Sequence, residues 1–420
     1  MGEIQRHIYQ DVLLEGHLID SNILSRIMGN VMELGGDFEF LTLDIGRQNT
    51  DPSRVRMRVF GKSADHMQQM LARLTSLGAS PEDLQDAQLA PSPADGVFPE
   101  NFYSTTNLVT AVHLEGQWRT VPNAEMDLGL RYNPATGEVR GVAISDARKG
   151  DLFVVGNQGL RVTQQERPRE IADFEFMNST ASSEKPKAQV IRQVANILRE
   201  VKAAEEAVIV VCGPAIVHTG ASEDLARLVR GGYVSVLFGG NAVATHDVER
   251  ALYGTSLGID MQTGLPVPGG HEHHLRAINR IRLAGSLTAA VEQGVVSEGL
   301  MHALVTNNVP FVLAGSIRDD GPLPPVYGDV YAAQNAMRDQ IRSATTVISM
   351  ATMLHTIATG NMTPSFRVLP DGTVRQVYFY CVDVSEFVVN KLADRGSLSA
   401  RGIVTNVQDF VVNLQKGLGL

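Results

Sequence analysis

The sequence predicts an α/β protein whose second half is a doubly wound, mostly parallel sheet, preceded by a small α+β (ferredoxin-like) region and a β-rich region. Three observations support this fold class. Residues 10–80 follow the order strand, helix, strand, strand, helix. Residues 102–162 contain short strand patterns separated by turn residues. From residue 208 onward, six apolar runs of strand length alternate with helical patterns, which is typical of a parallel sheet covered on both faces.

The length and composition restrict the class of protein. A chain of 420 residues is too long for one hydrophobic core, and we expect domains at residues 1–85, 86–175 and 176–420. A hydrophobic content of 44% with 20% charged residues is typical of a soluble globular enzyme. No apolar run reaches the roughly 18 residues that a membrane span requires, and the N-terminus has no secretory pattern. We therefore expect a cytoplasmic protein with no membrane partner.

Charge, cysteines and histidines exclude further kinds of site. A net charge of −10 argues against nucleic-acid binding, because that function needs a basic surface. Cys212 and Cys381 both lie in apolar runs, so we expect them in the core rather than in a disulfide or a metal site. His271, His273 and His274 lie close together, but no second cluster with ligand spacing accompanies them. We predict no metal site and expect these histidines to be solvated.

In the first region, DVLLEGHLI, FEFLTLDIG and RVRMRVFG are the predicted strands, and the helical patterns follow at residues 23–32 and 64–77. Residues 86–99 are rich in proline and polar residues, which predicts a linker or a domain boundary. Short strands then follow from TTNLVTAVHLEG to DLFVVGNQGLRVT, with hairpin turn residues at Asn133 and Pro134.

The second half begins with an amphipathic helix predicted at residues 185–202. The six predicted strands are VIVVCG, VSVLFGG, PFVLAGS, TTVISMA, VYFYCVD and GIVTN. Extra helices are inserted between residues 255 and 308. The order implies a sheet in which the carboxyl ends of all six strands meet at one edge.

The stretch VSVLFGGNAVATHD, residues 234–247, is the centre of this half. Its apolar run predicts a buried strand that ends at Gly239 and Gly240, and a helix is predicted at residues 245–253. Such a strand, glycine turn and helix can direct free backbone N–H groups at an anion. The alternative interpretation is a tight turn that packs against its own sheet.

Polar residues and glycines are concentrated where the predicted strands end, which is where parallel sheets bind ligands. Asp383 occupies the position at which an acid accepts the ribose hydroxyls in dinucleotide-binding domains, although it could also be a simple helix cap. The G-x-G-x-x-G fingerprint is missing, because the glycines of GPAIVHTG are too far apart and Pro214 removes a donor. Spacing alone therefore supports a nucleotide site only weakly.

The loop GSIRDDGPLP, residues 315–324, places Arg318, Asp319 and Asp320 directly after a buried strand. Charges in such a position are costly unless they are paired or used. They either form a self-contained Arg–Asp turn or contact an amine-bearing substrate or a cofactor. The sequence contains neither a G-x-S-x-G elbow nor a Walker lysine, so a serine hydrolase and a P-loop enzyme are both disfavoured.

Several long motifs resemble one known family. They are GPAIVHTG, FGGNAVATHDVE, YGTSLG, HLRAINRIR, NNVPFVLAGSIRDDGPLP, TMLHTIATGN, VDVSEFVVNKLADRGS and GIVTNV. Together they look like the NAD-dependent ornithine cyclodeaminases of the archaeal type, a module that also forms the C-terminal half of bifunctional arginine dihydrolase/ornithine cyclodeaminases. The N-terminal motifs, such as FYSTTN and KGDLFVVGNQGLRV, resemble the region named for lysine-oxoglutarate reductase/saccharopine dehydrogenase.

The resemblance implies a Rossmann-like catalytic domain that converts L-ornithine to L-proline and ammonia, with NAD reduced and reoxidised in each turnover. The NAD contacts that it implies all lie on predicted strand ends, at Asn241, Ala242, Asp320, Thr352, Met353, Leu354, His355, Asp383, Asn406 and Val407. Family members often have Asp at the position of Asn406, which weakens the cofactor contact expected there. An amide can still donate or accept.

The resemblance does not identify the catalytic base. The candidates for the catalytic residues are His218, His246, Asp247 and Asp319, with Asp319 the first choice as a base or as a partner of the substrate ammonium group; Lys391 lies on a helix that could face elsewhere. Two alternatives stay open: another NAD-dependent oxidoreductase acting on a lysine-derived or opine-type substrate, and a non-catalytic amino-acid sensor. We expect a homo-oligomer, either a dimer or a tetramer.

Overall fold

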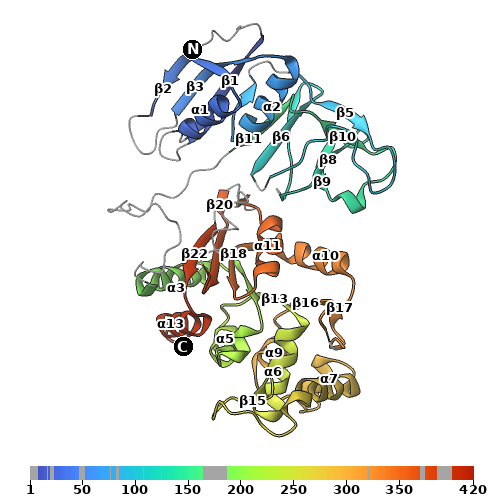
Figure 1. Ribbon diagram of the computed structural model, residues 1–420, viewed down its shortest axis with the longest axis vertical. Helices are drawn as coiled ribbons and strands as arrows, with labels where there is room; N and C mark the ends of the chain where they lie inside the picture. The colour runs from blue at the N-terminus through green and yellow to red at the C-terminus, as the bar shows by residue number, and fades with distance from the viewer. Residues whose placement is uncertain are drawn as a thin grey trace. The chain divides into compact units, whose positions relative to one another are not determined.

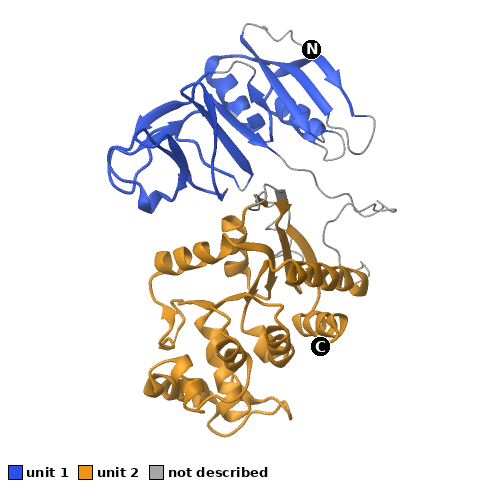
Figure 2. Ribbon diagram, turned by 180° about the vertical axis from the view of Figure 1, so that it is seen from behind, with its two compact units in different colours: residues 1–173 blue, residues 174–420 orange. Residues whose placement is uncertain are grey.

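The structure is a computed structural model, and it describes residues 8–16, 18, 23–46, 53–75, 77–81, 85–106, 108–123, 125–163, 187–319, 321–368, 374–385 and 400–420. The chain divides into two compact units, Met1–Asp173 (unit 1) and Phe174–Leu420 (unit 2) (Figure 2). The further division at residue 85, and the three-domain organisation as a whole, stay predictions. None of the described helices is both long enough and apolar enough to cross a membrane.

The first part of unit 1 has the predicted ferredoxin-like order. Its elements are β1 (Ile8–Gly16), α1 (Ile23–Glu33), β2 (Asp37–Asp44), β3 (Ser53–Gly61), α2 (Ala64–Thr75) and β4 (Ser80–Pro81). The strands form an antiparallel sheet in the order β2-β3-β1-β4. Alternate residues of β3, such as Val55 and Met57, are fully buried under Ile27 of α1 and Met70 of α2. This burial explains the strict alternation in RVRMRVFG.

The second part of unit 1 is β-rich, as predicted. One sheet has the order β5 (Gln88–Pro91), β10 (Leu152–Val155), β8 (Gly129–Asn133) and β9 (Glu138–Val142), and another has β11 (Leu160–Thr163), β6 (Val109–Leu114) and β7 (Gln117–Thr120). Residues 86–99 are not a simple linker, because β5 within them pairs with β10, while the alternative of a domain boundary there stays a prediction. Pro91 is tolerated at the end of β5 because β5 is an edge strand, so no second strand needs the backbone N–H that proline lacks.

Unit 2 confirms the Rossmann-like prediction (Figure 1). Its parallel strands are β12 (Ala207–Cys212), β13 (Val236–Gly240), β16 (Phe311–Ala314), β17 (Val326–Tyr327), β18 (Ala344–Met350), β21 (Tyr378–Asp383) and β22 (Ala400–Val404). The sheet order is β17-β16-β13-β12-β18-β21-β22. All six predicted strands are present, and the two-residue β17 was too short to predict.

Both faces of this sheet are buried. Val208, Val210 and Cys212 pack in one core with α3 (Lys187–Ala203), α5 (Ser222–Arg230) and α13 (Val407–Leu418). Ile209 and Val211 point to the opposite core, beside α10 (Val330–Ile341) and α11 (Met353–Met362). Because both faces are covered, the strands are mostly apolar on both sides, and this produced the apolar runs in the sequence.

The inserted segment between β13 and β16 is helical. It contains α6 (Asn241–Tyr253), β14 (Thr255–Ser256), β15 (Ile259–Asp260), α7 (His273–Ala284), α8 (Leu287–Glu292) and α9 (Leu300–Thr306). A short hairpin, β19 (Phe366–Val368) with β20 (Val374–Gln376), follows α11. The helix predicted after β21 falls largely on residues 386–399, which lie outside the described residues.

Two predicted helix starts were wrong. Helix α6 begins at Asn241, four residues earlier than predicted, and follows directly on Gly240, which is still extended (φ −100°, ψ 170°). Only a glycine fits at position 239 before so early a start, since an added Cβ there would lie 2.7 Å from Cγ1 of Val243 in the first turn of the helix. Ser222, predicted as the cap of α5, is instead its first residue and is fully buried.

The sheet order places a topological switch point between β12 and β18. Going outward from β12, the chain adds β13 and β16 on one side, and then β18, β21 and β22 on the other. Ligands of open α/β sheets bind beyond the carboxyl ends of the strands at such a point. The ends of β12 and β18 approach each other so closely there that an added Cβ at Gly213 would collide with the Ala351 carbonyl. We call the ends of β12, β13 and β16 the pocket half of this edge, and those of β18, β21 and β22 the rim half.

Candidate active site

A cavity of about 510 Å³ opens in the pocket half, and we call it the histidine pocket. Its walls come from α4 (Ala215–His218) with the residue before it, from α6 and α7, and from the loops after β14 and β16. Its lining residues are Pro214, His218, Asn241, Ala242, Thr245, His246, Leu257, His274, Ile278, Ser316, Arg318 and Asp319. Five of the predicted site residues are therefore brought together here, namely His218, Asn241, Ala242, His246 and Asp319.

The first two turns of α6 form one wall of the pocket. Asn241, Ala242, Thr245 and His246 are spaced so that they share one helix face. The side chain of Asn241 is buried, and its Oδ1 accepts hydrogen bonds from the Leu323 N–H at 3.0 Å and from the Thr245 hydroxyl at 3.3 Å. Asn241 thus ties the start of α6 to the loop that follows β16.

Three imidazoles meet in the pocket. The ring of His246 lies 4.8 Å from that of His218 and 6.3 Å from that of His274, measured between centroids. Burial lowers the pKa of His218, and His246 lowers it further, while Glu249 acts in the opposite direction. His218 is therefore neutral at pH 7 and can accept a proton. Its Nδ1 lies 2.7 Å from the hydroxyl of Ser256.

Glu249, one turn after His246 on α6, has no exposed surface. Its Oε2 lies 2.8 Å from Nδ1 of His246, and its Oε1 accepts from the Thr255 hydroxyl at 2.9 Å and the Gly258 N–H at 3.0 Å. Burial alone would raise the pKa of Glu249, but the hydrogen bonds from His246, Gly258 and Thr255 outweigh it and hold the pKa below its usual value. The carboxylate is therefore ionised.

Asp247, a predicted catalytic residue, does not line the pocket. It is fully buried on the other face of α6, where its Oδ2 accepts the Met301 N–H at 2.7 Å at the start of α9. The carboxylate also lies against Gly299, whose φ of 98° and closeness leave no room for a side chain. Burial raises the pKa of Asp247, although the hydrogen bonds from Met301 and Leu300 oppose this. Its position gives it a structural role, holding α9 against α6.

The loop after β16 is held by Asp319. Its Oδ2 accepts the Ser316 N–H at 2.8 Å, and its Oδ1 lies 3.4 Å from the Ser316 hydroxyl, which also accepts the Arg318 N–H at 3.1 Å. Within the described residues 315–319, Asp319 bonds to Ser316, and both Arg318 and Asp319 line the pocket. Asp320 and Lys391 lie outside the described residues.

The rim half carries the other predicted cofactor residues. Thr352 precedes α11, and its hydroxyl lies 3.2 Å from Nδ1 of His355. Burial lowers the pKa of His355. Met353 and Leu354 are large apolar side chains that are 47% and 76% exposed, so they are free to contact a ligand. None of these four residues lines the histidine pocket. The two halves meet where an added Cβ at Gly240 would lie 3.3 Å from Cε1 of His355.

The last two strand ends have simpler roles in the structure. Oδ1 of Asp383 accepts the Ser385 N–H at 2.9 Å, which leaves Oδ2 without a hydrogen bond among the described residues. Asn406 is the N-cap of α13, where its Oδ1 accepts the Gln408 N–H at 2.8 Å. Val407 is buried in the core, so only its backbone could meet a ligand.

Two helices that begin at the strand ends lack side-chain caps. No described side chain caps α6 at Gly240 or α11 at Thr352, and the same is true of α4, α5, α7 and α9. An uncapped helix start presents unsatisfied N–H groups and the positive end of its dipole, which together favour an anion. These two helix starts therefore fit the pyrophosphate of a dinucleotide.

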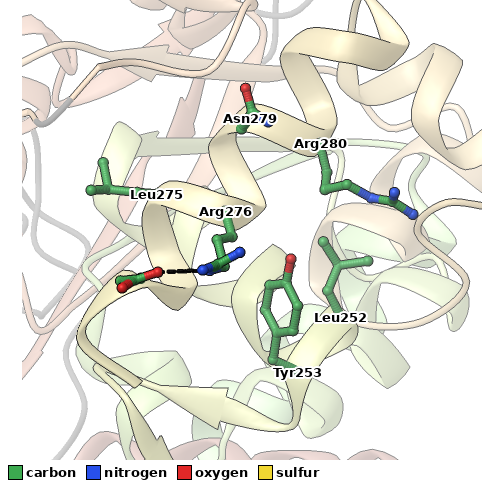
Figure 3. Close-up of a pocket in the computed structure, with 7 residues that line it drawn as sticks. Leu252, Tyr253, Leu275, Arg276, Asn279 and Arg280 are labelled. Atoms are coloured by element: carbon green, nitrogen blue, oxygen red, sulfur yellow. Dashed lines mark hydrogen bonds and ion pairs between the residues drawn. The ribbon is translucent and has the colours of Figure 1, made fainter. Parts of the chain in front are cut away.

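A second hollow, of about 720 Å³, lies on α7. Its lining residues are Leu252, Tyr253, Glu272, Leu275, Arg276, Asn279 and Arg280. Figure 3 shows Tyr253 and Leu252 from the end of α6 facing Arg276 and Arg280. Arg276 donates to Glu272 at 3.0 Å in an exposed pair. The hollow lies at the far end of α6 from Asn241, away from the strand ends, so it is not the candidate active site.

The sequence did not identify Thr245 or His274 as pocket residues, or Glu249 as the carboxylate that contacts His246. The spacing of His246 and Glu249, three residues apart, was the available signal, because it places them on the same face of a helix. The expectation that all three histidines of GGHEHH are solvated was wrong for two of them. His273 bonds to Thr255 at 2.8 Å and stacks on Tyr253, and His274 lines the pocket.

Three families match the chain along its length. Residues 9–108 match the LOR/SDH bifunctional enzyme conserved region, and residues 109–191 match the first region of the C-terminal part of arginine dihydrolase ArgZ-like proteins. Residues 192–414 match the Rossmann fold of that same C-terminal part.

Relatives and solved structures agree with these matches. The chain is 48% identical over 408 residues to an ornithine cyclodeaminase of Methanopyrus kandleri, a match that covers 97% of this chain and 96% of that protein. The apo structure of ArgZ, a cyanobacterial arginine dihydrolase, has a TM-score of 0.84 at 34% identity, covering 98% of this chain and 58% of that one. The ternary complex of AgrE with ornithine and NAD+ has a TM-score of 0.53 at 38% identity, covering 98% and 57%.

Proposed function

We propose that this chain, which belongs to the ornithine cyclodeaminase family of the archaeal type, converts L-ornithine to L-proline and ammonia with NAD as a recycled cofactor. The observation that carries the proposal is the histidine pocket, which combines imidazoles, a guanidinium group and a carboxylate beside the switch point of a Rossmann fold. The family supplies the reaction, and the pocket supplies groups suited to each part of the substrate.

The rim half and the start of α6 form the proposed binding site for NAD. The uncapped N-termini of α6 and α11 would hold the pyrophosphate, the free carboxylate oxygen of Asp383 would accept ribose hydroxyl donors, and Met353 and Leu354 would cover apolar surface. Bound NAD would supply the hydride acceptor for Cα of ornithine and would return the hydride to the cyclic product. Asp320 and Asn406 remain proposed contacts, the latter with its Oδ1 already used as a helix cap.

The histidine pocket is the proposed site for ornithine. A neutral imidazole, His246 or His218, would take the proton from the α-ammonium group, which must be lost before hydride can leave Cα. The carboxylate of Asp319 would attract the δ-ammonium group, and the guanidinium of Arg318 would pair with the substrate carboxylate. Once Cα is oxidised to the imine, the δ-nitrogen loses a proton and bonds to Cα, the α-nitrogen takes up that proton, and the bond between Cα and the α-nitrogen breaks to release ammonia.

A single incubation separates this reaction from the two alternatives. The purified full chain is mixed with L-ornithine and much less NAD than substrate, and proline, ammonia and absorbance of reduced nicotinamide are followed together. We expect proline and ammonia in equal amounts with no lasting NADH. NADH accumulating with turnover would favour an oxidoreductase acting on another amino acid, and the absence of any turnover would favour an amino-acid sensor. A homo-oligomer and a cytoplasmic location are part of the same proposal.

A further inference from the structure

We infer that Glu249 is a positioning residue that fixes the proton of His246 on Nδ1, so that Nε2 of His246 is the unprotonated nitrogen available to substrate in the histidine pocket. This inference rests on the proposed function, because it names the group that prepares the base. Glu249 itself does not line the pocket, and it acts through His246.

The hydrogen bonds of Glu249 leave it only one way to interact with the imidazole. An ionised carboxylate has no proton, so it accepts hydrogen bonds and donates none. The 2.8 Å contact between Oε2 and Nδ1 of His246 therefore requires the proton to lie on Nδ1 when the ring is neutral. The side chain of His246 is 12% exposed and lines the pocket, and Nε2 is its remaining nitrogen.

The surroundings keep Glu249 ionised and fixed in place. Thr255 and Gly258 donate to Oε1 at 2.9 and 3.0 Å, and the Leu257 N–H donates to Oε2 at 3.3 Å. Because the single hydroxyl proton of Thr255 goes to Glu249, the 2.8 Å contact of Thr255 with Nδ1 of His273 must be donated by that histidine. Strand β14 and the turn before β15 therefore hold the Glu249 carboxylate in place beside His246.

The charge of Glu249 also compensates for the proton that His246 would take up. The other charged or titratable groups that line the described part of the pocket are His218 from α4, His274 from α7, and Arg318 and Asp319 from the loop after β16. Unlike these groups, Glu249 is a buried carboxylate in direct contact with the ring of His246. A carboxylate that both orients an imidazole and balances its charge is the arrangement that supports proton abstraction in hydrolase triads.

The first test is the turnover of Glu249→Gln and Glu249→Ala. Glutamine is nearly isosteric and can still accept from Nδ1, but it carries no charge, and it can also present its N–H₂ group to the ring. We expect kcat to fall at least about tenfold for glutamine and further for alanine, within a range that reaches about 10⁴-fold for a misoriented imidazole. KM for ornithine should change little, because Glu249 does not contact the substrate. Wild-type kcat in both variants would overturn the inference.

Two comparisons separate positioning from a general structural role. Asp247→Ala removes the buried carboxylate on the other face of α6 without touching the contact between Glu249 and His246, so it should lower the melting temperature while leaving kcat unchanged. The double variant His246→Asn with Glu249→Gln should be no slower than His246→Asn alone, because Glu249 would have no base left to position. If the fold-decreases in kcat from the two single substitutions multiplied in the double variant, the two residues would act independently and the inference would be contradicted.

Nitrogen NMR of the imidazoles provides a test that needs no turnover. In the wild-type chain labelled with ¹⁵N-histidine, the neutral His246 ring should show the proton on Nδ1, with His246→Asn used to assign the signal. In Glu249→Ala the ring should shift toward the tautomer protonated on Nε2. A wild-type ring already protonated on Nε2 would overturn the inference even if proline is formed. If no proline is formed but the tautomer is as expected, the proposed function fails while the positioning by Glu249 stands.

Discussion

In the pocket half of the sheet edge, two histidines bond to other side chains, whereas two strand-end residues of the rim half bond to the local backbone. In the pocket half, His246 bonds to Glu249 one turn further along α6, and His218 of α4 bonds to Ser256 of β14. In the rim half, Asp383 bonds to an N–H only two residues away, as does Asn406. The pocket half is therefore preorganised by side chains, as chemistry at a substrate requires.

The rim half is shaped mainly by backbone. Its uncapped helix α11 and its exposed Met353 and Leu354 suit a long ligand that is held by many weak contacts. We therefore expect substitutions in the pocket half to affect kcat strongly, and those in the rim half to affect mainly the affinity for NAD.

The largest effect is expected for His246→Asn. Removal of the base should lower kcat by about 10² to 10⁴-fold, which is the usual contribution of general base catalysis, with the dissociation constant for NAD unchanged. Steady-state proline formation and calorimetric titration with NAD measure the two quantities. The matched control is His271→Asn, because His271 is 83% exposed and lies outside the pocket. Full activity of His246→Asn would remove this residue from the mechanism.

A smaller effect is expected for Asp319→Asn. The loss of one charged hydrogen bond to the δ-ammonium group should lower kcat/KM by about 10- to 150-fold, and much of that should appear as a higher KM. The amide retains an oxygen for the Ser316 N–H, so the loop should keep its conformation. Asp339→Asn, on an exposed surface pair with Arg342, is the control. If both variants show the same kinetics, Asp319 does not bind substrate.

In the rim half, Asp383→Ala should raise the dissociation constant for NAD about tenfold, which corresponds to one hydrogen bond to a charged group. Asp383→Asn should have a smaller effect, since it can still accept the Ser385 N–H. Titration of each variant with NAD, followed by fluorescence or calorimetry, provides the measurement. An unchanged affinity in both would place the ribose elsewhere, and a fall in kcat at saturating NAD would break the proposed division between the halves.

The smallest effect concerns stability and pH. Burial lowers the pKa of His218 in the pocket half and of His355 in the rim half. The unfolded chain takes up these protons near its ordinary pKa of about 6.5, so below that pH it binds more protons than the folded chain. The free energy of unfolding should therefore fall as the pH falls below about 6.5, by at most about 1.4 kcal/mol per pH unit for each histidine. Urea denaturation of His218→Gln, His355→Gln and the control His271→Gln should show a shallower fall in the first two variants only.

The sequence by itself determined the sheet and the edge at which ligands bind. Apolar runs such as VIVVCG can be satisfied only when both faces of a strand are buried, and the helices between them force the strands to be parallel. The carboxyl ends then have to meet at one edge. For this reason the sequence alone identifies Asn241, His355 and Asp383 as strand-end residues.

Only the tertiary structure decided between neighbours. His246 and Asp247 were equal candidates in the sequence, but consecutive helix positions point about 100° apart. The packing of α9 against α6 buried Asp247 and left His246 facing the cavity. The carboxylate that accompanies His246 was likewise hidden in the sequence, because Thr255 and Gly258 reach Glu249 only when the chain after α6 folds back onto the helix. Local patterns fix which elements form, whereas the direction of each side chain depends on what packs against the helix that carries it.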